Sequence, residues 1–200
     1  MPNRTVIALM LLPLLGCFAQ VENDSIVLTH NLCGTGTNCV PGGGAPLSLI
    51  TVSGSNTFTV SFGDQPLLQP STAVGPASLT TSLLLNQAAF DMETSGANFS
   101  GVTAAQLLVA PRQSTGPGDD PCAAPANCPV LASYTKGPAD PAPDQHLALQ
   151  GNGSDLVNYI DQASHSLIVE IAAQGTAPSA PSWNADVSMD MALKSRAKFP

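Results

Sequence analysis

Residues 183–199 alternate between apolar and polar side chains throughout, and this pattern constrains the fold more than any other feature. A period of two is that of a β-strand, whereas a buried helix face repeats every 3.6 residues. At ~3.3 Å per residue the run would extend about 55 Å, longer than a sandwich strand usually is. We therefore expect a strand with one face in the core, which bends or breaks near Leu193, where the polar face changes from acidic to basic. The predicted buried face carries Trp183, Ala185, Val187, Met189, Met191, Leu193, Ser195, Ala197 and Phe199.

Shorter β-rich runs recur along the chain, separated by Gly, Pro, Ser and Asn. Residues 57–62 alternate cleanly, and residues 53–56 predict a hairpin loop between them and a strand at 47–52. Past the first 20 residues, about 180 residues are enough for one domain with its own core. The fold class expected is therefore all-β, an antiparallel β-sandwich or jelly roll. Further strands are expected at residues 25–29, 78–85, 89–93, 102–110, 130–134, 146–150 and 166–173.

Three connections rich in Pro and Gly interrupt these strands, at residues 40–46, 66–76 and 111–143. Loops longer than about 12–15 residues are uncommon unless they are functional or disordered. The longest of the three contains two cysteines, so a disulfide there would limit its disorder.

The N-terminus has the pattern of a secretory leader. Arg4 provides the positive charge, and residues 6–15 form an apolar run too short to span a bilayer as a helix. Residues 14–17, Leu-Leu-Gly-Cys, resemble a bacterial lipobox, which implies lipidation of Cys17 as the first mature residue. The alternative is ordinary cleavage after Ala19, which would release a soluble secreted protein. The interpretation favoured is a signal peptide at 1–16, a lipidated N-terminus, tether and first cysteine loop at 17–46, and a β-sandwich domain at 47–200. Residues 21–46 could equally be a first strand followed by a loop.

Apart from Cys17, the four cysteines form two C-x5-C pairs, Cys33 with Cys39 and Cys122 with Cys128. Four cysteines allow three connectivities, and we expect the two local bridges because each pair lies within one stretch of turn-forming residues. In the chain-entropy model each bridge stabilises the fold by roughly 2–2.5 kcal/mol. A four-cysteine zinc site is the alternative, but such sites favour C-x2–4-C spacing. Disulfides agree with export to an oxidising compartment.

The charge balance excludes a nucleic-acid-binding surface. The chain has 6 Lys and Arg against 14 Asp and Glu, a formal net charge of −8. Between residues 21 and 193 only Arg112 and Lys136 are basic, so no clustered basic face is available there. The same balance argues against tight binding of the chain to anionic lipid. The remaining cations of the mature chain lie in the last seven residues: Lys194, Arg196 and Lys198.

Residues 155–160, Asp-Leu-Val-Asn-Tyr-Ile, followed by 166–171, Ser-Leu-Ile-Val-Glu-Ile, resemble the late segment of galactose-binding-like jelly rolls. In that family a short turn leads into an inner strand. The resemblance implies that Leu156, Tyr159 and Ile160 close the edge of the sandwich. It also implies that Leu167, Val169 and Ile171 fill one inner face. It covers 17 of 200 residues and implies fold rather than sugar binding.

No catalytic motif is present in the sequence. The three histidines, His30, His146 and His165, lack metal-ligand spacing to another His, Cys or Glu, and no G-x-S-x-G motif occurs. Asp186 and Asp190 lie about 13 Å apart along one strand face, too far for paired glycosidase carboxylates. No cofactor is indicated. Oxygen-rich loops make weak calcium candidates, for which surface turns are the alternative explanation: Asp119, Asp120, Asn152 and Asp155.

The candidate ligand-binding residues are aromatic: Tyr134, Trp183 and Tyr159. Trp183 falls on the predicted inward face, which favours a role in the core over a sugar platform. The function expected is a non-catalytic, lipid-anchored protein of the bacterial outer membrane or cell surface, which binds or supports another envelope protein or glycan. A secreted or tethered carbohydrate-binding module is the second hypothesis. A small hydrolase with an unrecognised site is the third.

Overall fold

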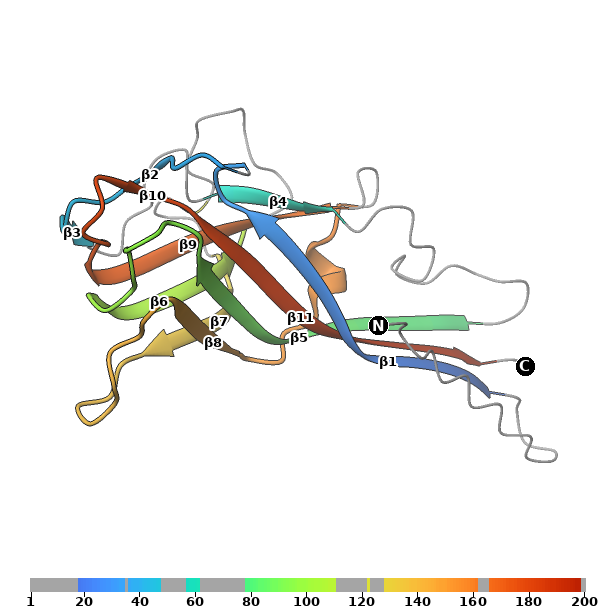
Figure 1. Ribbon diagram of the computed structural model, residues 1–200. Coiled ribbons are helices and arrows are strands. Elements are labelled where there is room, and N and C mark those ends of the chain that lie inside the picture. The colour runs from blue at the N-terminus through green and yellow to red at the C-terminus, as the bar shows by residue number, and fades with distance from the viewer. Residues whose placement is uncertain are drawn as a thin grey trace.

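The computed structural model describes residues 18–34, 36–47, 57–61, 78–110, 122, 128–161 and 166–198, and it is a β-sandwich as predicted (Figure 1). A short 3-10 helix, η2, covers Leu156–Tyr159. The strands are β1 (Phe18–Asn31), β2 (Val40–Pro41), β3 (Pro46–Leu47), β4 (Thr57–Ser61), β5 (Ser78–Met92), β6 (Val102–Val109), β7 (Val130–Thr135), β8 (His146–Gly151), β9 (Ser166–Thr176), β10 (Ser182–Trp183) and β11 (Ala185–Lys198).

All strand pairs are antiparallel, and the main sheet runs in the order β1-β11-β5-β8-β7-β6-β9-β3, with β4 also on β9. Only two residue pairs join β7 to β8, Ala132 with Gly151 and Ser133 with Gln150. The sheet folds over at this narrow junction. One layer is formed by β1, β11, β5 and β8, and the other by β7, β6, β9, β3 and β4. A separate two-stranded ribbon, β10-β2, lies at one end.

The core fills the space between the two layers with alternate residues of their strands. Leu85, Leu149 and Met189 from the first layer are at most 1% exposed, as are Leu107 and Val169 from the second. Burial of such side chains is the main favourable term in folding, at about 25 cal/mol per Å² of apolar surface. The β-alternation that predicted the strands therefore also defines the core.

Strand β11 confirms the predicted face and corrects the predicted length. Its odd positions from Ala185 to Ser195 are all buried. Trp183 belongs instead to β10, which pairs with β2, and Asn184 separates the two strands. Strand β11 bends but does not break. The extra residues lie in the neighbouring strands, because β1 has a bulge between Asn23 and Ile26 and β5 has one opposite Asp190 and Met191.

Strand β5 corrects the prediction of separate strands at 78–85 and 89–93. It is continuous, and the bulge at Asn86 shifts the phase of alternation by one residue. Leu83 and Leu85 are buried before the bulge, and Ala88 and Phe90 after it. A bulge adds one residue and bends the strand without ending the ladder. The sequence alone does not predict this bulge, because it depends on the register of β5 with its partner strand β11.

The predicted hairpin between 47–52 and 57–62 falls mainly on residues 48–56, which lie outside the described residues. Both β3 and β4 pair with the same edge of β9, β3 at Gly175–Thr176 and β4 at Ser166–Glu170. Strand β2 lies within the predicted 40–46 loop. Strand β1 is much longer than the predicted 25–29 and pairs with β11 from Phe18 to Asn31. The main sheet therefore includes residues that the sequence assigned to a tether.

The segment that resembles galactose-binding-like jelly rolls packs as the resemblance implies. Leu156 and Ile160 are buried, and Tyr159 is partly buried against the core. On β9, Leu167 and Val169 are buried and Ile171 is partly buried against the same core. Asp155 begins the 3-10 helix, and its carboxylate accepts hydrogen bonds from the backbone N–H groups of Val157 at 3.1 Å and Leu83 at 2.9 Å.

Candidate functional site

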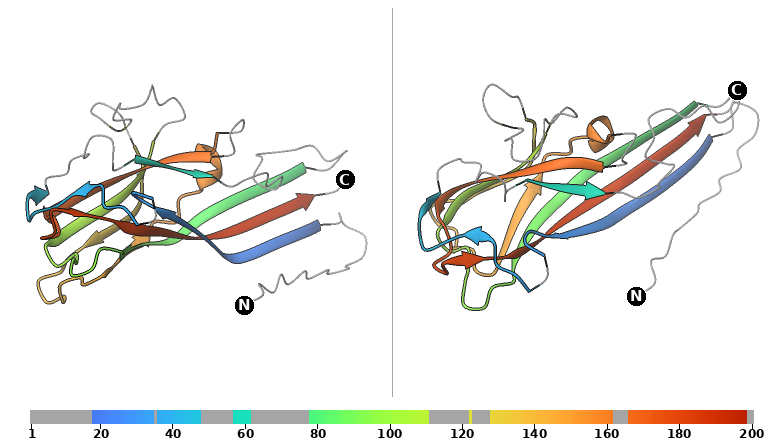
Figure 2. Two further views of the ribbon diagram at one scale, coloured as in Figure 1. Left: turned by 45° about the horizontal axis from the view of Figure 1, so that its top comes forward. Right: turned by 90° about the horizontal axis from the view of Figure 1, so that it is seen from above.

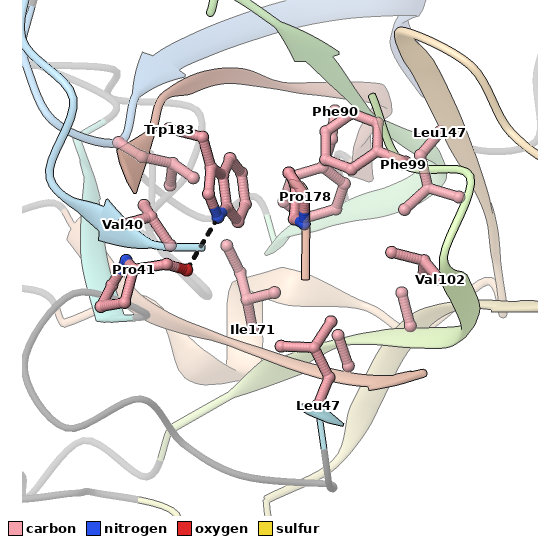
Figure 3. Close-up of a pocket in the computed structure, with 13 residues that line it drawn as sticks. Val40, Pro41, Leu47, Phe90, Phe99, Val102, Leu147, Ile171, Pro178 and Trp183 are labelled. Atoms are coloured by element: carbon pink, nitrogen blue, oxygen red, sulfur yellow. Dashed lines mark hydrogen bonds between the residues drawn. The ribbon is translucent and has the colours of Figure 1, made fainter. Parts of the chain in front are cut away.

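An apolar pocket of about 70 Å³ lies at the end of the sandwich that carries the β2-β10 ribbon (Figure 3). Phe90 and Leu147 reach it from one layer, and Val102 and Ile171 from the other. The ribbon and the loops beside it complete the wall. All the lining residues are apolar: Leu32, Val40, Pro41, Leu47, Phe90, Phe99, Val102, Ala105, Leu147, Ile171, Ala173, Pro178 and Trp183.

Trp183 forms a fixed wall of this pocket. Its Nε1–H donates to the Pro41 carbonyl at 3.0 Å, shown as the dashed line in Figure 3. Its ring meets Phe99 edge-on, with ring centroids 5.8 Å apart and planes at 89°. Such edge-to-face pairs contribute about 0.5–1.5 kcal/mol beyond their buried area. Because the indole N–H is already bonded, Trp183 offers a ligand only carbon.

Close backbone contacts continue the pairing of β2 with β10 along the chain. The N–H groups of Gly42, Gly43 and Gly44 donate to the carbonyls of Pro181, Ala180 and Pro178. A Cβ at Gly42 would overlap the Ala180 carbonyl oxygen, so only glycine fits there. Within the connection predicted at residues 40–46, the glycine run is therefore hydrogen-bonded to the segment before β10.

The Cys33–Cys39 disulfide closes the loop between two lining residues, Leu32 and Val40. Asn184, 2% exposed, ties this loop to the sheet. Its Oδ1 accepts from the Cys33 backbone N–H at 3.1 Å, and its Nδ2 donates to Asn31 Oδ1 at 2.9 Å. The second predicted bridge, Cys122–Cys128, is also formed. Both local pairings are confirmed.

The lining favours uncharged apolar groups, because no side chain that lines the pocket in the described part of the chain ionises and the polar Trp183 atom is engaged. An engineered apolar cavity of about 150 Å³ is large enough to bind benzene. This pocket has less than half that volume, so it suits a narrow aliphatic group rather than an aromatic or sugar ring.

The structure separates the three aromatic candidates. Trp183 lines the pocket, whereas Tyr159 packs on the core from η2 and Tyr134 lies on β7, partly buried. Burial, and then the Asp140 carboxylate, raise the pKa of Tyr134 above its usual value of 10.0. The three rings do not form a shared platform.

The candidate acid–base residues are dispersed. His146 Nδ1 lies 2.7 Å from Asp91 Oδ1 in an exposed pair across β5 and β8. His30 lies on β1, and burial lowers its pKa below 6.5, against the opposing effect of Asp186. Asp186 accepts from Asn31 Nδ2 at 2.8 Å and Asp190 from Ser25 Oγ at 2.9 Å. His165 lies outside the described residues.

In the loop at 152–155, the side-chain oxygens of Asn152 and Asp155 accept hydrogen bonds from backbone N–H groups of the protein. Asn152 Oδ1 accepts from the Ser154 N–H at 2.9 Å, its Nδ2 donates to the Val130 carbonyl, and Asp155 caps η2. Such a turn explains these polar residues without calcium. Asp119 and Asp120 lie outside the described residues. Within the described ranges, no group of three or more His, Cys, Asp or Glu side chains is placed to hold a metal ion.

Trp183 was one of three candidate ligand-binding residues in the sequence, although its inward face favoured a role in the core, and the other residues that line this pocket were not among the candidates. They come from six strands and three positions between strands, which only the fold brings together. One local signal was available: Leu32, Val40 and Phe99 are large apolar residues beside Cys, Gly or Asn, where turn chemistry predicts polar side chains.

Comparisons with known proteins give no family. No family model and no curated protein matches the chain. Among solved structures, the VP1 protein of trichodysplasia spinulosa-associated polyomavirus, in complex with GM1 oligosaccharide, is similar at a TM-score of 0.21 and 7% identity, covering 89% of this chain and 95% of that chain. No helix in the described part of the chain is long and apolar enough to cross a membrane.

Proposed function

We propose that this protein is a non-catalytic, lipid-anchored protein of the bacterial cell envelope whose end pocket binds an apolar group of another surface component. The pocket carries this proposal, because its lining offers shape and carbon contacts but no group for acid–base or nucleophilic chemistry. Binding sites of this kind are concave and mostly apolar.

Two observations support export and anchoring. Both disulfides are formed, and disulfides persist in oxidising compartments. The lipobox-like residues 14–17 end at Cys17, directly before the first residue of β1, Phe18. Acylation would therefore attach the sheet to the membrane through its own first strand.

The alternative of carbohydrate binding finds less support among the described contacts. Sugar platforms use exposed rings, but Trp183 lies in a pocket too small for a sugar ring and Tyr159 packs on the core. Tyr134 and Tyr159 lie outside the pocket lining, and both are partly buried against the core.

Trp183 is the one tryptophan of the chain, so intrinsic fluorescence tests binding at the pocket directly. A series of 1-alkanols, from butanol to octanol, serves as neutral aliphatic probes. The test variant is Ala105→Leu, which fills the pocket from β6. The matched control is Ala104→Leu, because the neighbouring residue on a strand points to the opposite face. Ala173→Val is a milder second filling variant.

We expect a saturable change in Trp183 emission with the alkanols, weakened at least tenfold by Ala105→Leu and retained in Ala104→Leu. Circular dichroism checks that each variant is folded. If Ala105→Leu does not fold, Ala173→Val gives the decisive comparison. No saturable change in the wild-type protein, or equal binding by the filling and control variants, would overturn the pocket as the binding site.

A further inference from the structure

Three strands extend together beyond the body of the sandwich and form an arm (Figure 2). The arm consists of residues 18–23 of β1, 193–198 of β11 and 78–83 of β5. It lies beyond β8, which pairs with β5 only from Gln87 to Asp91. Strand β11 is central and is paired on both sides along this whole length. The arm is therefore a hydrogen-bonded sheet rather than a loose tail.

The arm has one buried and one exposed face. Thr81 and Ser195 are 7% and 3% exposed, and their hydroxyl groups lie 3.1 Å apart. Residues directly opposite each other on antiparallel strands share a face. The solvent face carries Lys194 and Arg196, both exposed, and the next register pair at the tip is Phe18 with Lys198. The other residues that pair with these three cations are Glu22 and Gln20 on β1 and Ser82, Thr80 and Ser78 on β5.

Charge changes sign along this face of β11. Asp186 and Asp190 lie over the body of the sandwich, whereas all three cations lie on the arm. Glu22 lies opposite Lys194, with its Oε1 4.0 Å from Lys194 Nζ. Three of the six cations of the whole chain therefore gather at the tip of an otherwise acidic protein with a net charge of −8.

We infer that the arm tip docks on the anionic headgroups of the membrane that holds the lipidated N-terminus. This inference rests on the proposed lipid anchor, because Cys17 precedes Phe18 and would place the tip at the bilayer surface. Basic residues beside an acyl anchor add a second membrane signal. Each cation near an anionic surface raises membrane affinity about fivefold. Because the lipid at Cys17 would hold the cationic tip at the bilayer, the partner is lipid headgroups rather than another acidic protein.

The contact is short-ranged and depends on the anchor. At physiological salt the field of headgroups falls off within about 8 Å, so only residues held at the surface feel it. A lipid at Cys17 supplies that proximity. The net charge of −8 disfavours binding of the whole chain to anionic lipid. The basic tip can still turn toward the headgroups because the anchor holds it near them.

The test uses the mature chain with Cys17→Ser, which removes acylation and isolates the electrostatic contact. Sedimentation with vesicles of phosphatidylcholine and phosphatidylglycerol at 7:3 is compared with pure phosphatidylcholine at low salt. The test variant is Lys194→Gln/Arg196→Gln/Lys198→Gln. The control is Gln145→Glu/Gln150→Glu/Asn158→Asp, which lowers the net charge by the same three units at exposed positions away from the arm.

We expect wild-type and control proteins to bind the anionic vesicles at least tenfold better than the triple Gln variant, with binding lost at high salt. Equal binding by the two triple variants, or no preference of the wild-type protein for anionic vesicles, would overturn the docking of the tip. The mass of the protein made with its own leader tests the anchor separately. A lipidated protein with no anionic preference contradicts only this inference, whereas an unlipidated one contradicts the proposed function.

Discussion

At the scale of single residues, Asn184 does most to connect the pocket to the sheet. Its side chain bonds both Cys33 and Asn31, and its own backbone N–H donates to Thr94 Oγ1 at 2.8 Å. The residue is nearly fully buried, so each lost bond would leave a buried polar group unsatisfied. The sequence predicted position 184 on the wet face of a strand, and only the break between β10 and β11 shows why it is buried.

Asn184→Ala should lower the free energy of unfolding by about 1–3 kcal/mol, the usual cost of leaving buried partners unbonded. Urea denaturation measures the change. Asn158→Ala, at an exposed position, is the control and should change stability by less than about 0.5 kcal/mol. Equal effects of the two substitutions would contradict the role assigned to Asn184.

His30 should make stability depend on pH. Burial lowers the pKa of His30 in the folded state below its unfolded value of 6.5. Between these two pKa values the unfolded chain binds more protons, so the free energy of unfolding rises with pH up to about 6.5 and then levels off. His30→Gln should flatten this rise. Denaturation midpoints from pH 5 to 8 measure it, and an unchanged slope in His30→Gln would refute the assignment.

At the scale of elements, local patterns were predictable and pairings were not. The alternation in 185–198 predicted β11 and its buried face correctly. The bulge at Asn86 and the shared edge of β9 depend on strands distant in sequence. The two disulfides were predictable because each joins cysteines six residues apart. The pocket was not, because its wall is assembled from separate segments.

Both disulfides should stabilise the fold, but loss of the Cys33–Cys39 bridge alone should weaken ligand binding at the pocket. Among the described residues, the Cys33–Cys39 loop joins two that line the pocket, Leu32 and Val40, whereas neither Cys122 nor Cys128 lines it. Replacing Cys33 and Cys39 by Ala should weaken alkanol binding and lower stability by roughly 2–2.5 kcal/mol. The Cys122–Cys128 bridge closes a loop of the same length, so replacing these two cysteines by Ala is the matched control. This variant should lose a similar amount of stability and bind alkanols unchanged. Alkanol titration of both variants decides between these outcomes, and equal weakening would refute the distinction.

At the scale of the whole molecule, the arm tip and the pocket lie at opposite ends. Strand β1 runs from Phe18 at the tip to Asn31 beside the disulfide loop, about 45 Å at ~3.3 Å per residue (Figure 1). With the tip on the membrane, the pocket would lie at the end of the molecule farthest from the bilayer, where it could bind other envelope components. The anchor, the spacer and the site would then be parts of one continuous strand ladder.

The intact mass of the mature protein, made with its own leader in a bacterial host, tests this account most directly. The account predicts a chain that begins at Cys17 and carries a diacylglycerol, with four further cysteines alkylated only after reduction. A chain that begins at Gln20 without lipid would contradict the anchor on which the orientation depends. Four thiols that alkylate without reduction would contradict the oxidising compartment.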